Sequence, residues 1–137
     1  MEKDTLSLES QDKVFQIDRY KIGPLWFING TLTDILFQGG IIVPAQDPDF
    51  VRIFRARISK NVTLDKDGVV LFSRKAYAHK DDVDKVKFVV AQLPPDTYIL
   101  ASIKTLNAYK SPRIVVPERD NNRQARFEFE LSGVFYT

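Results

Sequence analysis

The chain has 137 residues, of which 44% are hydrophobic and 28% charged, and it contains no cysteine. This length and composition are typical of one globular domain with a core of its own. The lack of cysteine excludes disulfide bonds, cysteine-ligated zinc, iron–sulfur clusters and thiol nucleophiles.

The first twelve residues are polar and acidic, with Leu6 and Leu8 as apolar anchors. They predict a flexible N-terminal arm over residues 1–12. The same residues lack the basic start and the apolar run of a secretory signal. No stretch approaches the roughly 20 apolar residues of a membrane-spanning helix. We therefore expect a protein of the cytoplasm, or of a particle assembled there such as a virion, with no membrane partner.

From residue 13 onward, short apolar or alternating runs are separated by turn residues. The predicted strands span residues 14–22, 25–28, 31–37, 41–43, 50–58, 69–77, 86–93, 97–106, 114–116, 125–131 and 134–136. No segment shows sustained helical periodicity. The sequence therefore predicts one all-β domain over residues 13–137. Its expected fold is an antiparallel β-sandwich of about eight short strands, immunoglobulin-like or jelly-roll-like.

Two turn sequences locate the expected hairpins. Asn29-Gly30 and Asp67-Gly68 are both typical of tight hairpin turns. Within residues 50–58, the apolar residues change from one alternation to the other near Ile53. A change of this kind predicts a β-bulge at that point of the strand.

Residues 88–100 read as a strand, then the turn Leu-Pro-Pro-Asp-Thr-Tyr, then a second strand. This segment resembles the strand–turn–strand segment of transthyretin-like (carboxypeptidase-regulatory-like) domains, in which the turn often reads Leu-Pro-Pro-Gly-Thr-Tyr. The match covers 13 of the 137 residues, and Asp96 stands where the family prefers glycine. The resemblance implies an immunoglobulin-like sandwich with a structural or adhesive role and no enzymatic activity.

Residues able to carry out catalysis or to bind metal are sparse. His79 is the only histidine, and it lies in a charged segment without a nucleophile motif beside it. Asp81, Asp82 and Asp84 form a carboxylate cluster, but it lacks the spacing of a calcium loop and lysines flank it. We therefore expect a protein that is not an enzyme and that has no cofactor or metal. A hydrolase whose carboxylates come from distant parts of the chain remains an alternative.

The near-neutral net charge of +2 hides two opposed blocks. Residues 1–49 carry 4 basic and 8 acidic side chains, whereas residues 50–80 carry 8 basic and 2 acidic ones. Residues 81–137 carry 8 of each. The residues that we expect to bind a partner lie in the basic block: Arg52, Arg55, Arg57, Lys60, Arg74 and Lys75. A hairpin turn at Asp67-Gly68 would bring them onto one basic face.

Three interpretations of this basic face remain open. In the first, opposed charges on neighbouring copies drive head-to-tail assembly. In the second, the basic face binds nucleic acid, with Phe50, Phe54, Phe72 and Tyr77 close to its charges. In the third, it is a solvated surface whose arginines pair with the acidic segment of the same chain, residues 1–49.

Of the two functional interpretations, we carry the first forward. The predicted function is that of a non-enzymatic structural or assembly subunit of a larger complex, for example a virion, phage capsid or tail accessory protein. It would act through contacts with other proteins or with its own copies. The alternative is a nucleic-acid-binding β-barrel.

Overall fold

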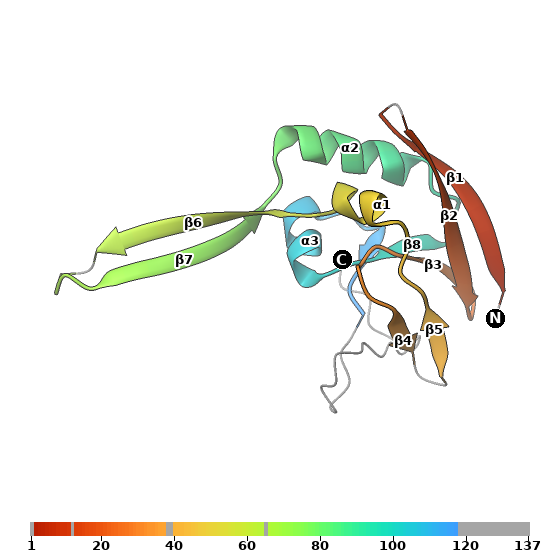
Figure 1. The fold of residues 1–137 in the computed structure, drawn as a ribbon, viewed down its shortest axis with the longest axis horizontal. Coiled ribbons are helices and arrows are strands. Elements are labelled where there is room, and N and C mark those ends of the chain that lie inside the picture. The colour runs from red at the N-terminus through yellow and green to blue at the C-terminus, as the bar shows by residue number, and fades with distance from the viewer. Residues whose placement is uncertain (1, 12, 38–39, 65, 118–137) are drawn as a thin grey trace.

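The computed structural model describes residues 2–11, 13–37, 40–64 and 66–117 (Figure 1). In chain order, its elements are β1 (Lys3–Ser10), β2 (Lys13–Ile22), β3 (Leu25–Asn29), β4 (Ile35–Phe37), β5 (Ile41–Val43), α1 (Pro48–Ile53), β6 (Arg57–Leu64), β7 (Val70–Tyr77), α2 (Lys80–Ala91), β8 (Thr97–Leu100), α3 (Ile103–Tyr109) and β9 (Ile114–Val115). The prediction of a strand-rich chain is confirmed. The prediction of an all-β chain is wrong, because α1, α2 and α3 interrupt the strands.

The main sheet has five strands in the order β1-β2-β3-β8-β9. The pairs β1–β2 and β2–β3 are antiparallel, whereas β3–β8 and β8–β9 are parallel. Two further ladders, β4–β5 and β6–β7, have two strands each. The expected wholly antiparallel arrangement is therefore wrong. Parallel neighbours need a connection that returns the chain to the same end of the sheet, and α3 provides it between β8 and β9.

The N-terminal segment, predicted to be a flexible arm, is instead the edge strand β1. All its residues pair with β2, from Lys3 opposite Tyr20 to Ser10 opposite Lys13. Leu8 is buried in the core. The side-chain amide of Gln92, just after α2, accepts from the Glu9 amide and donates to the Glu9 carbonyl, each over 2.7 Å. The alternating leucines thus give this segment an apolar face, which covers part of the core.

The two faces of the main sheet bury different layers, because neighbouring residues of a strand point to opposite sides. Ile28, Ile99 and Ile114 face a core that also contains buried residues of all three helices. Phe27, Leu100 and Val115 face a second core, completed by β4 and β5. Figure 1 shows α1 and α2 on one side of the sheet and β4–β5 on the other. The small ladder and the helices thus enclose the sheet from both sides.

Helix α1 occupies residues that were predicted to begin a bulged strand at 50–58. The Asp47 side chain accepts a hydrogen bond from the Asp49 amide and caps the helix, and Pro48 is its first residue. Phe50 and Phe54 are both buried and are four residues apart, so they lie on one side of a helical turn. The apparent change of alternation is therefore a helical period, and the predicted bulge is wrong.

Helix α2 replaces the strand predicted at residues 86–93. The His79 side chain caps it by accepting a hydrogen bond from the Asp81 amide. Val86, Val89 and Leu93 are buried at intervals of three and four residues, which is a helical spacing. The segment at 88–100 is thus the end of a helix, a turn and the strand β8, rather than strand, turn and strand.

The turn and strand that follow α2 also differ from the prediction. Asp96 adopts a φ of +60°, the backbone region that favours glycine. The strand predicted at 97–106 stops at Leu100, because Ser102 caps α3 by accepting a hydrogen bond from the Thr105 amide. The predicted C-terminal strands at 125–131 and 134–136 lie outside the described residues.

The hairpin predicted at Asn29-Gly30 is wrong, whereas the one at Asp67-Gly68 is confirmed. After β3 the chain leaves the sheet, and the strand predicted at 31–37 is reduced to β4, which pairs with β5. Strands β6 and β7, on either side of Asp67-Gly68, pair over their full length from Arg57 opposite Tyr77 to Leu64 opposite Val70.

Candidate functional site

The six basic residues predicted to bind a partner are spread over three elements. In chain order they are Arg52 in α1, Arg55 after it, Arg57 and Lys60 in β6, and Arg74 and Lys75 in β7. The first two are exposed residues of the body, at α1 and directly after it. The other four lie on the β6–β7 ladder, which we call the arm (residues 57–77).

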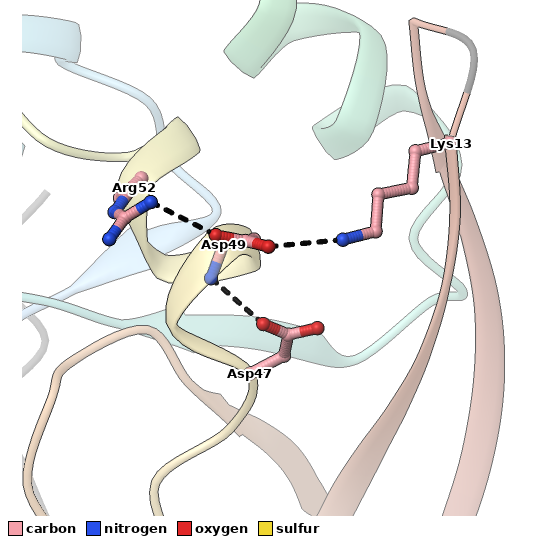
Figure 2. A network of polar contacts seen from close by, with 4 residues as sticks. All are labelled: Lys13, Asp47, Asp49 and Arg52. Carbon is pink, nitrogen blue, oxygen red and sulfur yellow. Dashed lines mark hydrogen bonds and ion pairs between the residues drawn. The ribbon is translucent and has the colours of Figure 1, made fainter.

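Helix α1 positions Arg52 in a small ionic network, shown in Figure 2. Asp49 accepts from the Arg52 guanidinium over 3.0 Å through one oxygen and from the Lys13 ammonium over 3.2 Å through the other. The Asp49 amide in turn donates to Asp47 over 2.8 Å. One carboxylate thus serves two cations, and the Asp47 carboxylate beside it accepts from the backbone.

The base of the arm is attached to the body through Arg57. Its Nε donates to Asp82 of α2 over 2.8 Å. The hydrogen bond from Arg57 holds the pKa of the Asp82 carboxyl below its ordinary value. The Tyr109 hydroxyl donates to the Arg55 carbonyl over 3.0 Å, and burial raises the pKa of Tyr109, so this donor keeps its proton. Two polar contacts thus join the root of the arm to α2 and α3.

We expect replacement of Arg57 by glutamine to raise the pKa of Asp82 toward its ordinary value of 3.8. The stability that this pair contributes is complete above the ordinary pKa and is lost as the pH falls through the lowered one. A carboxyl ¹³C NMR titration of the two proteins measures the shift. The same Asp82 pKa in both would contradict the assignment, and Asp96, on a distant turn, provides the reference carboxyl.

The pairing register of the arm separates its residues into two faces. Lys60 is opposite Arg74, whereas Lys75 is opposite Ser59 and Arg57 is opposite Tyr77. Residues opposite each other share a face of a ladder, and faces alternate along it. The single basic face predicted for all six residues is therefore wrong. Lys60 and Arg74 share one face, and Arg57 and Lys75 share the other.

The face that contains Lys60 and Arg74 is otherwise apolar. Its remaining positions are Ile58, Val62, Leu64, Val70, Phe72 and Ala76. We call these eight positions the apolar face of the arm. Figure 1 shows the arm extending away from the sheet and the helices, with no described helix or strand beside its far half. Near the tip, Val70 is 47% exposed. The register therefore places six apolar residues on one face of a ladder whose far half extends beyond the other described elements.

The remaining candidates for chemistry have structural contacts. His79 caps α2, and Asp82 pairs with Arg57. Within residues 2–11, 13–37, 40–64 and 66–117, no three His, Asp or Glu side chains are grouped as metal ligands. None of the helices in the described part of the chain is long and apolar enough to cross a membrane.

The chain matches no protein-family model, no curated protein and no solved structure. The resemblance of residues 88–100 to transthyretin-like domains therefore stays a prediction. What the site can do rests on its own geometry: a rooted arm with apolar residues at the positions of one face, and two arginines, Arg52 within α1 and Arg55 just after it.

The sequence interpretation missed the acidic partners of this site. Asp49 is three residues before Arg52, a spacing that pairs side chains on a helix, and the Asp47-Pro48 sequence was the signal for that helix. Asp82 is 25 residues from Arg57, so only the fold brings them together. Pairing with the acidic segment, residues 1–49, is found for Arg52, whereas Arg57 pairs with Asp82 outside that segment.

Proposed function

We propose that this protein is a non-enzymatic subunit of a larger protein assembly, and that the arm is its contact with a neighbouring protein. The observation that carries the proposal is a ladder that extends beyond the body, with six apolar residues at the positions of one face. A two-stranded hairpin is marginally stable in water by itself and gains stability when an apolar face is covered. The root contacts at Arg57 and Tyr109 give the arm a defined direction from the body.

The cellular setting belongs to the same proposal. We propose that the assembly forms in the cytoplasm, or in a particle assembled there such as a virion. We also keep the predicted β-sandwich as a proposal. It applies to the part of the chain in which β4–β5 packs on the main sheet. The opposed charge blocks of the sequence support the assembly, and the core that β4–β5 shares with the main sheet supports the sandwich.

The first neighbour to test is a second copy of the chain. Val62 and Phe72 are opposite each other on the apolar face, and replacing both by threonine keeps β-propensity while removing apolar surface. We expect the unmodified chain to associate as its concentration rises and the double variant to remain monomeric. Sedimentation equilibrium measures the mass, and circular dichroism checks that the fold is kept.

The control for this variant uses the adjacent pair on the opposite face. Asn61 and Ser73 are opposite each other, and replacing both by threonine changes the same two strands. This control should associate like the unmodified chain. Equal association of the two variants, or an unmodified chain that is monomeric at every concentration, would count against assembly between copies through this face.

Nucleic acid is the second candidate partner, and one observation favours it. Lys60 and Arg74 face each other on a two-stranded ribbon, a shape that the major groove of DNA admits. If phosphates bind here, affinity for duplex DNA must fall steeply with salt. It must also fall when Lys60 and Arg74 are both replaced by alanine. An affinity for duplex DNA that does not change with salt concentration would exclude this candidate.

A further inference from the structure

A cavity of about 440 Å³ lies at the carboxyl ends of two neighbouring parallel strands. Gly30 follows β3 and Ser102 follows β8, and both line the cavity. The Gly30 amide donates to the Leu100 carbonyl over 2.7 Å, and a Cβ on Gly30 would approach that oxygen to 2.8 Å. This glycine therefore lets the two strand ends meet. In open sheets, the carboxyl ends of parallel strands are a common place for ligands.

Two arginines, Arg52 and Arg55, also line the cavity. Arg55 is exposed, and its side chain makes no hydrogen bond or ion pair with any residue that the structure describes. Arg52 donates to Asp49 through one terminal nitrogen, and Asp49 also serves Lys13. Among the described residues, the cavity therefore has one arginine without an acidic partner and one whose carboxylate is shared with Lys13. Its electrostatics favour a negatively charged occupant.

The hydroxyl groups of the wall are already engaged. Thr105 Oγ1 donates to the Phe54 carbonyl over 2.9 Å, and Thr31 Oγ1 donates to Asn29 Oδ1 over 2.7 Å. The guanidinium groups are thus the polar groups best placed to bind a ligand. The rest of the lining includes the apolar side chains of Leu32 and Val51. Leu32 is 69% exposed, so a large apolar side chain stands in water at this cavity.

We propose that this cavity binds a small organic anion, with a carboxylate or phosphate head group held by Arg55 and Arg52 and an apolar body packed on Leu32 and Val51. A guanidinium binds both head groups in the same forked geometry. The apolar body removes the surface of Leu32 from water. The cavity lies in the body of the protein and not on the arm, so its test is independent of the assembly proposal.

The test is an amide NMR titration of the full chain with three probes: octyl phosphate, octanoate and inorganic phosphate. We expect at least one octyl probe to saturate and to shift the amides of residues 30–32 and 51–55. Inorganic phosphate should bind at least about tenfold more weakly, because it lacks the apolar body. The tighter of the two octyl probes identifies the head group.

Replacing Arg55 by alanine should weaken binding of the octyl probe about tenfold, because one charge-assisted hydrogen bond to the head group is lost. Lys104 is exposed on α3 and does not line the cavity, so Lys104→Ala is the matched loss of one cation and should leave the affinity unchanged. Three results would overturn the proposal: no saturation by either octyl probe, shifts centred elsewhere, or equal affinities for the two variants.

Discussion

Replacing Asn29 by alanine is expected to lower the free energy of unfolding by about 2–4 kcal/mol, because it leaves the buried Val43 carbonyl unpaired, at a cost of about 1–3 kcal/mol, and removes three part-buried hydrogen bonds. The Asn29 side chain is fully buried at the end of β3. Its amide nitrogen donates to the Thr33 and Val43 carbonyls over 2.8 and 3.0 Å. Its oxygen accepts from the Thr31 amide and hydroxyl over 2.8 and 2.7 Å. One side chain thus holds the chain where it leaves β3 and holds the end of β5.

Urea unfolding measures this loss. Asn107 is exposed on α3, so Asn107→Ala is the matched control, and we expect it to change stability by no more than about 0.5 kcal/mol. A loss at Asn29 no larger than the loss at Asn107 would show that these four hydrogen bonds do not hold the connection.

The second large effect is expected at Phe50. Replacing it by alanine should cost about 3–5 kcal/mol, since it removes a fully buried ring and leaves a cavity. The ring packs edge-on against Phe15 and Phe54, with centroids 5.6 and 5.2 Å away. Phe50 therefore joins α1 to the main sheet, and its loss weakens the support of Arg52.

Phe88 offers the same substitution in the opposite environment. It lies on α2 and is 52% exposed, so Phe88→Ala should cost far less than Phe50→Ala in the same urea unfolding experiment. Equal losses from the two variants would mean that α1 does not pack through Phe50 as described.

Part of this fold is readable from the sequence. Strands with clear boundaries, such as β2 and the Asp67-Gly68 hairpin, follow from alternation and turn residues. Helix α2 does not, because the run around Val86 and Val89 is short, β-branched and compatible with either structure. The parallel pairing of β3 with β8 joins residues about 70 apart in the chain, and no local pattern encodes such a partner.

The candidate site was predictable to a similar extent. The distribution of charge along the sequence shows where the basic residues are concentrated, and the predicted hairpin brings Lys60 and Arg74 together. Which residues share a face depends on the register, and a shift of one residue moves every side chain to the other face. The cavity beside Arg55 was not predictable, because β3, α1 and α3 meet there only in the folded chain.

The role of the arm is tested most directly by photo-cross-linking in the native cell. A photoreactive phenylalanine at position 72 lies on the apolar face, and one at position 104 lies on the exposed surface of α3. We predict a discrete protein adduct from position 72 and none from position 104. Equal adducts from the two positions, no protein adduct from position 72, or an adduct with nucleic acid alone would contradict a protein-binding arm.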